Sequence, residues 1–235
     1  MIWAAAWIEK YGHSLQQIEM STKYNYIPAM GFFSLSRWYD PLVSLLMNEA
    51  RFKGQLIENA RIPPAGAVLD VGCGTGTLLL MVKIAQPEAR VRGLDGDDGI
   101  LKIARGKIMK SSWEVPLEQA MAYDMPYADK CFDRVLTSLT LHHLSGENTR
   151  RTLQEVLRVL VPGGELHVAD FSGGHQQLGH LKSHFRLHSG RPGHMDASQL
   201  ELLLVEAGFS SVETLGATST LLGRIGYFSG AKPRE

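Results

Sequence analysis

The sequence predicts an α/β fold in which helices cover both faces of a doubly wound parallel sheet. From Ala65 onward, short β-rich runs alternate with helical patterns about 10–15 residues long, which is the order of elements that builds such a sheet. A glycine-rich turn at residues 72–76 follows the first of these runs, and sheets of this kind bind ligands at the carboxyl ends of their strands. At 235 residues the chain is long enough for one such domain and an appendage, but short for two full domains.

The first sixty residues differ in kind from the rest of the chain. They hold three of the four tryptophans, and a helical pattern follows Pro41, in which Phe52 and Leu56 lie four residues apart. We interpret residues 1–60 as an N-terminal helical cap that docks its apolar face on a larger body, residues 61–235.

The first half of the larger body has a pattern of four strands and two helices. Strands are expected at residues 67–71, 90–95, 113–121 and 132–139, and helices at residues 77–85 and 97–109. The first helix is apolar and stops before Pro87. The second begins with acidic residues and has Lys107 near its end, as the helix dipole favours. Because Pro116 has no N–H for a sheet ladder, we place the third strand at an edge of the sheet.

The second half continues the alternation. Helices are expected at residues 147–160 and 196–208, and strands at residues 165–171, 211–218 and 221–228. In the first of these helices, Leu153, Val156 and Leu160 recur on one face, and a Pro-Gly-Gly turn follows. The second opens on the capping box Asp-Ala-Ser-Gln and closes at Gly208.

Composition excludes several classes of function. The 24 basic and 24 acidic residues cancel, so no global field attracts nucleic acid or an anionic membrane. Two cysteines, Cys73 and Cys131, do not make a disulfide framework, which favours a reducing compartment. The longest apolar run, residues 1–8, is too short for a membrane span. We therefore expect a cytoplasmic protein with no integral membrane segment and no nucleic-acid partner.

The glycine turn lies between two acidic residues that end successive strands. Gly72, Gly74 and Gly76 follow Asp70, and Asp95 ends the second strand. Without a Cβ the backbone turns tightly and approaches a ligand closely, and the N-terminus of the next helix attracts a carboxylate or phosphate. Asp70 repels a pyrophosphate but suits a ligand with an ammonium and a sulfonium, and Asp95 accepts hydrogen bonds from a ribose diol.

A dinucleotide-binding turn is the competing interpretation. That fingerprint, G-x-G-x-x-G, needs glycine or alanine where this chain has Thr77. Asp70 also argues against a pyrophosphate at this place, so a nicotinamide-dependent oxidoreductase is the alternative enzyme class. A glycine-rich turn that binds no ligand is the third interpretation.

From about Ala65 to its end, the chain resembles the class I S-adenosylmethionine-dependent methyltransferases. Besides the glycine turn, the resemblance rests on residues 122–133, which end in Asp-Lys-Cys-Phe-Asp, on Ser-Leu-Thr-Leu-His-His-Leu at 138–144, and on Leu-Arg-Val-Leu-Val-Pro-Gly-Gly-Glu-Leu at 157–166. It implies a Rossmann-like sheet of seven strands in the order 3-2-1-4-5-7-6 with the last strand antiparallel. It also implies S-adenosyl-L-methionine as cofactor and methyl transfer (EC 2.1.1 type) as activity.

The resemblance also implies a set of cofactor contacts. Gly72, Gly74 and Gly76 would line the methionine moiety, with Asp70 near its ammonium group. Asp95 would bind the ribose, and Leu94 and Gly96 would lie against the adenosine. Met121 and Ala122 would flank the adenine, and Ser138 and Cys73 would complete the site. Many relatives carry Asp at position 121, to accept from the adenine amino group. Here that bond would come from Asp124, from water, or be absent.

Catalytic residues are less clearly indicated, because in-line methyl transfer needs a base only when the acceptor must lose a proton. His142 and His143 follow the fourth strand and are the candidates for that base; the alternative is that His143 caps or packs the next helix. Neither cysteine has a nucleophile signature. Five further histidines lie between residues 171 and 196, three of them on one helical face, but no Asp, Glu or Cys there completes a metal site, and we expect none.

Within the superfamily, the chain is most similar to the broad group around the ubiquinone/menaquinone biosynthesis C-methyltransferases. Arg-Trp-Tyr-Asp at 37–40 matches their N-terminal Tyr-Asp, but Leu-His-His-Leu at 141–144 stands where they have Gly-Leu-Arg-Asn. We expect a small, apolar or aromatic acceptor, covered either by an aromatic lid that includes Tyr24 and Trp38 or by ordinary cap packing. The accepting atom (C, N or O), the oligomeric state and a non-catalytic S-adenosylmethionine-binding role stay open.

Overall fold

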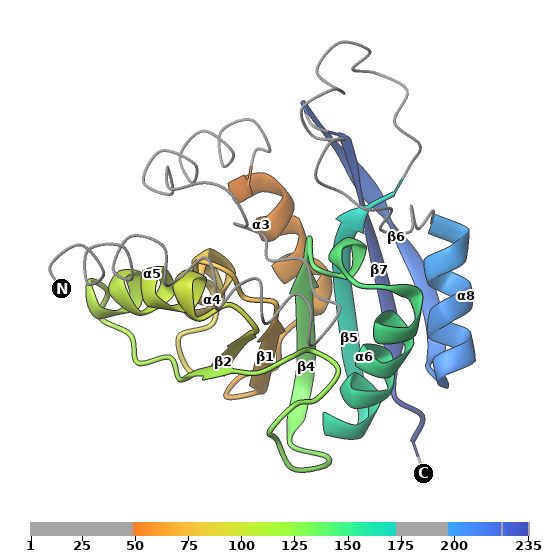
Figure 1. The fold of residues 1–235 in the computed structure, drawn as a ribbon, viewed down its shortest axis with the longest axis horizontal. Helices are drawn as coiled ribbons and strands as arrows, with labels where there is room; N and C mark the ends of the chain where they lie inside the picture. The colour runs from red at the N-terminus through yellow and green to blue at the C-terminus, as the bar shows by residue number, and fades with distance from the viewer. Residues whose placement is uncertain (1–48, 173–196, 222, 235) are drawn as a thin grey trace, which may run out of the picture.

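The computed structural model describes residues 49–172, 197–221 and 223–234. They form a seven-stranded sheet with helices on both faces (Figure 1). The elements in chain order are α3 (Glu49–Ala60), β1 (Ala67–Val71), α4 (Thr77–Ala85), β2 (Arg90–Asp95), α5 (Asp98–Met109), β3 (Leu117–Gln119), β4 (Phe132–Ser138), the short 3₁₀ helix η1 (Leu141–His143), α6 (Gly146–Val159), β5 (Leu160–Phe171), α8 (Ala197–Ala207), β6 (Ser210–Thr220) and β7 (Gly223–Ala231).

The strand order confirms the expected topology. It is β3-β2-β1-β4-β5-β7-β6, with every pair from β3 to β5 parallel and β7 antiparallel to both β5 and β6. The carboxyl ends of β1, β2, β4 and β5 therefore lie along one edge of the sheet. Loops that leave these ends bring residues far apart in the sequence together.

Two apolar layers hold the helices on the sheet. On one face, Phe52 and Leu56 of α3 pack with apolar residues of α4 and α5. On the other, Leu153 of α6 and Leu204 of α8 pack against Leu69 and other residues of the strands. Side chains alternate between the faces of a strand, so strands such as β1, β4 and β5 supply both layers. This arrangement confirms a doubly wound sheet with two covered faces.

Helix α3 is part of the first layer, although its residues fall in the segment expected to form a cap. Phe52 and Leu56 are 1% and 0% exposed. Complete burial of two such side chains stabilises the fold by about 1.5–3 kcal/mol each. The division of the chain at residue 60 stays a prediction, because residues 1–48 lie outside the described part of the chain.

The third strand is much shorter than predicted. It covers only Leu117–Gln119, whereas the sequence pattern suggested residues 113–121. Its pairing with β2 starts at Leu117, just after Pro116, whose carbonyl oxygen accepts a hydrogen bond from the N–H of Gly93. Because proline cannot return such a bond, the ladder extends no further back. The predicted edge position is confirmed.

The fifth strand begins earlier than predicted, at Leu160 instead of residue 165. Leu160 pairs with Phe132, and the register shifts between Phe132 and Arg134 before regular pairing resumes at Glu165. Helix α6 correspondingly ends at Val159. The Pro-Gly-Gly turn thus lies within an irregular strand and does not precede it.

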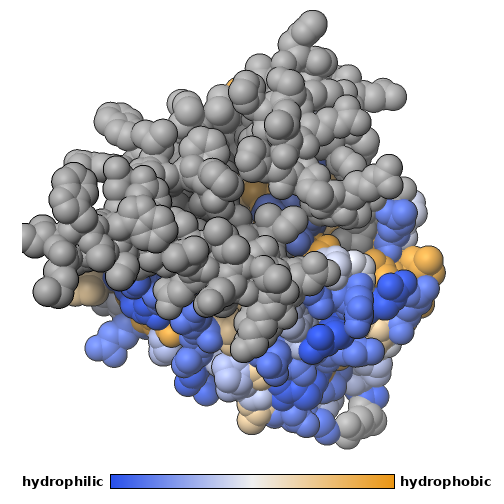
Figure 2. Space-filling view, in the orientation of Figure 1, coloured by the Kyte–Doolittle hydropathy of each residue, from blue (hydrophilic) through white to orange (hydrophobic). Residues whose placement is uncertain are grey.

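Exposed apolar side chains on the described surface include two on helix α8. Leu202 and Val205 are 57% and 58% exposed. Figure 2 shows hydrophobic surface at the edge of the molecule where α8 lies, while most other described residues on this face are hydrophilic. Among the described helices, none combines the length and apolar character needed to span a membrane.

Candidate functional site

The glycine turn joins the ends of β1 and β2 at the carboxyl edge of the sheet. The backbone N–H groups of Gly72 and Cys73 both donate to the carbonyl oxygen of Leu94, at 2.8 and 3.0 Å. The N–H of Gly74 donates to Oδ2 of Asp95 at 2.9 Å. These bonds hold the turn against β2. They bring Asp70 and Asp95, the two acidic residues that the sequence predicted at strand ends, close together.

Asp70 is buried and accepts no hydrogen bond from the described residues. Its side chain is 1% exposed, and neither carboxylate oxygen has a hydrogen-bond partner among the described residues. Burial raises the pKa of Asp70 to about 7; nearby Asp95 adds to the rise and the positive charge of Lys53 opposes it. A buried carboxyl without donors is costly, so a cation or a hydrogen-bond donor beside it would be stabilising.

Gly72 and Gly74 are glycines for different reasons. Both have left-handed backbones, with φ of +71° and +55°. A Cβ on Gly72 would lie 2.3 Å from Oγ1 of Thr140, so the turn and the loop after β4 touch at this point. Among the described residues, no atom would lie within 4 Å of a Cβ on Gly74. The described residues therefore leave the backbone of Gly74 open to the close approach of a ligand.

Asp95 is partly engaged by the backbone and keeps acceptor capacity. Oδ2 accepts from Gly74, and Oδ1 accepts from the N–H of Asp97 at 2.9 Å. Each carboxylate oxygen has a second lone pair. Burial raises the pKa of Asp95, while those two backbone donors lower it. Cys73 beside it is buried, and burial first, then the charges of Asp70 and Asp95, raise the pKa of its thiol, which makes it a poor nucleophile.

The predicted adenosine contacts lie near the end of β2. A Cβ on Gly96 would lie 2.9 Å from the sulfur of Met121, so these two residues are in contact. Ala122 is buried, and the side chain of Leu94 lies in the core. Asp124, the suggested replacement acceptor, is exposed in a turn in which its N–H donates to the carbonyl of Met121.

The loop after β4 places His142 against a buried carboxylate that sequence reasoning missed. Nδ1 of His142 lies 2.6 Å from Oδ1 of Asp170. Asp170 is the last residue but one of β5, and its carboxylate also accepts from the backbone N–H groups of Leu141, His142 and Phe171. Burial raises the pKa of Asp170, but the charge and ring N–H of His142 with the backbone donors lower it below its ordinary value. The signal was available, because Asp170 is a third acidic residue at a strand end.

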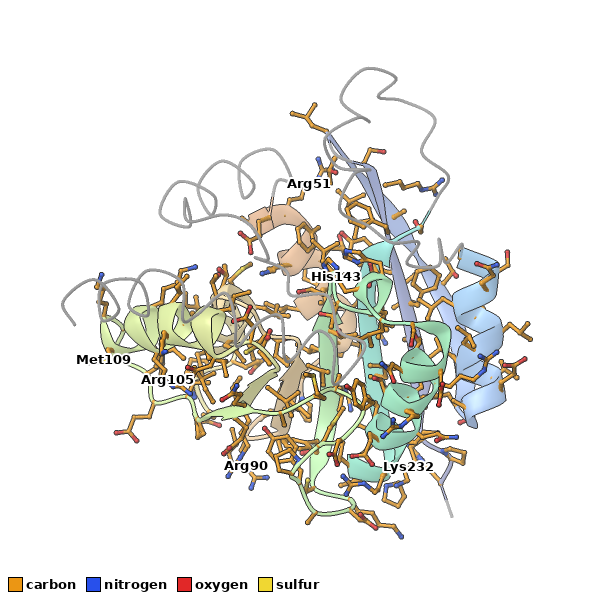
Figure 3. The ribbon with its side chains drawn as sticks, viewed as in Figure 1. Arg51, Arg90, Arg105, Met109, His143 and Lys232 are labelled. Atoms are coloured by element: carbon orange, nitrogen blue, oxygen red, sulfur yellow. The ribbon has the colours of Figure 1, made fainter. Side chains whose placement is uncertain are left out.

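His143, the other candidate base, has a different environment. Burial lowers its pKa to about 4, and the charge of His142 contributes. Figure 3 shows His143 near the carboxyl ends of the strands, whereas Arg90 and Lys232 lie at the opposite end of the sheet. The rings of His142 and His143 lie 4.0 Å apart, so His143 packs on its neighbour.

Two lysines near the turn were also missed. Lys53 of α3 is buried, pairs with Glu49, and acts electrostatically on Asp70. Lys107 of α5 donates to the hydroxyls of Thr75 and Thr77, at 2.8 and 3.2 Å, and ties the turn to α5. Neither residue belongs to a recognisable motif, and only the packing of helices on the sheet brings them here.

Other predicted features fall outside the described residues. The five histidines between residues 171 and 196 and the aromatic residues of the segment 1–48 belong to this group. Ser138 is among the described residues. It ends β4 and pairs in register with Ala169 of β5. Within the described ranges, no group of three or more His, Cys, Asp and Glu side chains is arranged to hold a metal.

Comparisons with known proteins give this site a context. Residues 68–164 match the family model described as "Methyltransferase domain". The chain is 33% identical over 144 residues to the ubiquinone/menaquinone biosynthesis C-methyltransferase of Bordetella avium, and 34% identical over 142 residues to the demethylmenaquinone methyltransferase of Thermus thermophilus. Both matches cover 60% of this chain, and they span 56% and 64% of those relatives.

The fold has close counterparts among solved structures. An S-adenosylmethionine-dependent methyltransferase from Aquifex aeolicus superposes with a TM-score of 0.64 at 19% identity, over 84% of this chain and 96% of that one. The strand order with its antiparallel β7, the glycine turn between two strand-end carboxylates and the family match all agree. Residues 68–164 thus match a methyltransferase domain, within a chain that has the seven-stranded fold of an S-adenosylmethionine-dependent methyltransferase.

Proposed function

We propose that the chain transfers a methyl group from S-adenosylmethionine to a small, apolar or aromatic acceptor. The observation that carries this proposal is Asp70, a carboxyl that is 1% exposed and has no partner among the described residues. It lies next to a turn whose backbone faces open space at Gly74. A cationic ligand stabilises the ionised form of such a carboxyl, and the cofactor of this class carries both an ammonium and a sulfonium.

The other residues of the edge fit the rest of the cofactor. Besides the bonds from Gly74 and Asp97, each oxygen of the Asp95 carboxylate has a second lone pair that can accept from a ribose diol. Met121, in contact with Gly96, offers an apolar surface for a base. The bound cofactor supplies a methyl group on a sulfonium. The chain binds it, aligns it with the acceptor and excludes water, and orientation alone contributes about 7–11 kcal/mol to such reactions.

A nicotinamide-dependent reaction fits these residues less well. A pyrophosphate at this turn would lie near Asp70 and Asp95, two carboxylates that are both buried. Repulsion between like charges is strong where water is excluded. The relatives support the acceptor class, since their names refer to ubiquinone, menaquinone and demethylmenaquinone. Transfer of that substrate class to this chain rests on the likeness alone.

Calorimetric titration tests the cofactor. S-adenosylmethionine or S-adenosylhomocysteine should bind with one site per chain, whereas NADH and NADPH should give no response. The reverse pattern would eliminate the methyltransferase proposal.

A transfer screen with a labelled methyl group tests the reaction. Quinols, phenols, amines and phospholipid head groups should be offered separately with labelled cofactor, and label should appear in a quinol or phenol. Tight cofactor binding without transfer to any acceptor would favour a non-catalytic binding protein, because the fold alone does not fix the reaction.

A further inference from the structure

His142 and Asp170 form a pair whose geometry is set by four hydrogen bonds. Asp170 is 4% exposed and accepts three backbone N–H groups and the ring nitrogen of His142. Two of these donors, at Leu141 and His142, belong to η1 itself. The carboxylate therefore fixes the short helix and the imidazole ring together. An unusual number of donors on one buried carboxylate indicates a rigid position for the ring.

The same bonds determine which ring nitrogen carries the proton. Asp170 is ionised, because its pKa is lowered, and an ionised carboxylate only accepts hydrogen bonds. Nδ1 of His142 must then carry the hydrogen in the 2.6 Å contact. In a neutral imidazole this leaves Nε2 with a free lone pair. Among the described residues, nothing hydrogen-bonds Nε2, and the side chain is 25% exposed.

The pair lies at the edge that holds the cofactor residues. Ser138 and Ala169, which precede η1 and Asp170, are paired in register on β4 and β5. The glycine turn touches Thr140, the N-cap residue just before η1, since a Cβ on Gly72 would collide with its side chain. His142 is therefore two residues along the chain from a direct contact with the turn.

A second histidine–carboxylate pair provides an internal comparison. Nε2 of His167 lies 3.0 Å from Oε2 of Glu165, also on β5. Its residues, Glu165 and His167, pair with Arg134 and Leu136, which lie four and two residues before the end of β4. His167 is 3% exposed, so it is shielded from any acceptor, and burial lowers its pKa although Glu165 opposes this shift. The two pairs thus share their chemistry but only one is accessible at the carboxyl edge.

We propose that His142 is the catalytic base, that Asp170 is its positioning residue, and that the acceptor is therefore a phenolic hydroxyl. This inference rests on the function proposed above. As the hydroxyl proton passes to Nε2, the oxygen forms a bond to the methyl carbon and the carbon–sulfur bond breaks with its electron pair going to sulfur. The products are a methyl ether, a neutral thioether and an imidazolium stabilised by Asp170. Phe171, edge-on to His142 at 5.1 Å, gives the aromatic acceptor an apolar neighbour.

Nuclear magnetic resonance of the ligand-free protein tests the pair without any turnover. Long-range proton–nitrogen spectra of the histidine rings should show His142, identified by the signals lost in His142→Gln, protonated at Nδ1 when neutral. In Asp170→Asn this preference should be lost. Glu165→Gln should leave the His142 signals unchanged. A ring protonated at Nε2 in the wild type, or an unchanged ring in Asp170→Asn, would overturn the proposal.

Two phenols that differ in the pKa of their hydroxyl distinguish a catalytic base from a residue that only positions the acceptor. A nitrophenol is already ionised at about pH 8, whereas an unsubstituted phenol, with a pKa of about 10 like tyrosine, is not. His142→Gln should slow transfer to phenol at least about 100-fold but transfer to nitrophenol less than about tenfold. Asp170→Asn should lower kcat for phenol at least about tenfold and leave the Kd of S-adenosylhomocysteine unchanged.

Control variants and the outcomes that would overturn each proposal complete the experiment. The variants His167→Gln and Glu165→Gln should keep wild-type transfer, since His167 is 3% exposed and therefore shielded from the acceptor. Equal losses with both phenols, transfer to amines only, or no transfer to either phenol would overturn the hydroxyl acceptor. Failure of the wild type to bind S-adenosylhomocysteine would instead contradict the underlying function. The two proposals are thus tested separately.

Discussion

Three carboxylates lie at or next to the carboxyl ends of β1, β2 and β5, and they differ in their hydrogen-bond partners. Asp170 accepts four hydrogen bonds, Asp95 accepts two from the residues described above, and Asp70 has none among the described residues. The pKa of Asp170 is lowered, whereas burial raises those of Asp95 and Asp70. A buried carboxylate with hydrogen-bond partners stabilises the fold, whereas one without partners carries an uncompensated desolvation cost.

Asp70 should make the ligand-free protein less stable as the pH rises. Because its folded pKa of about 7 exceeds the ordinary value of 3.8, the folded state keeps a proton that the unfolded chain has released. The stabilising effect is therefore complete below about pH 4 and lost as the pH rises toward 7. Replacing Asp70 by Asn should remove this dependence, so that the variant gains up to about 4 kcal/mol relative to wild type between about pH 4 and pH 8.

Urea unfolding across that pH range measures the difference. Asp98→Asn is the matched control, because hydrogen bonds from Lys102 and Arg105 lower the pKa of Asp98, so its small effect has the opposite sign. Parallel stability curves for Asp70→Asn and wild type would contradict a protonated, buried Asp70. The same variant should bind S-adenosylmethionine more weakly, since it loses the charge that matches the ammonium group.

Asp95→Ala should weaken S-adenosylhomocysteine binding by at least about tenfold. The loss of even one charge-assisted hydrogen bond to the ribose costs about 1.4 kcal/mol. The N–H groups of Gly74 and Asp97 also lose their acceptor, so the turn itself becomes less stable. Calorimetry should show the loss for Asp95→Ala and none for the nearby Asp98→Ala. Unchanged affinity would remove Asp95 from the site.

At the scale of the element, the glycine turn combines a packing role and a binding role. In Gly72→Ala, the Cβ would collide with the side chain of Thr140 at a φ of +71°, so the variant should lose well over about 1 kcal/mol of stability. In Gly74→Ala, only the left-handed φ is costly, about 1–2 kcal/mol, because the space is open. The second variant should therefore stay folded but lose cofactor affinity.

Unfolding curves and titrations on both variants separate the two roles. Gly106→Ala is a suitable control, since a Cβ there meets nothing within 4 Å in helix α5 and alanine favours a helix. If Gly74→Ala bound S-adenosylhomocysteine as tightly as wild type, the open space at Gly74 would not be part of the cofactor site.

Elements with strong local signals were predicted best. Helix α5 begins one residue later than predicted and ends where predicted, because Asp97 caps it by accepting from the N–H groups of Gly99 and Ile100. The third strand was predicted too long, because β-rich residues extend past Pro116 but the hydrogen-bond ladder does not. The start of β5 was missed because its pairing with Phe132 depends on a register shift. Local propensity carries no information on such pairing.

At the scale of the whole molecule, the family resemblance predicted the part of the strand topology that local sequence patterns could not. Alternating strands and helices predict a parallel sheet, but the antiparallel β7 between β5 and β6 followed only from the family. The bond between His142 and Asp170 joins residues 28 positions apart. Sequence reasoning found the histidine and missed its partner, because only the parallel pairing of β4 and β5 brings the two together.

Because the proposed cofactor contacts come from β1, β2 and the loop after β4, binding should stabilise the whole domain. A ligand that binds only the folded state adds about 2.7 kcal/mol to the free energy of unfolding at 100 times its Kd. Urea unfolding with S-adenosylhomocysteine at that concentration should show this increase, and hydrogen exchange should slow at the amides of Gly72, Cys73 and Gly74. NADH should produce neither effect. A comparable gain with NADH, or protection confined to the opposite end of the sheet near Lys232, would place the ligand elsewhere than the carboxyl edge.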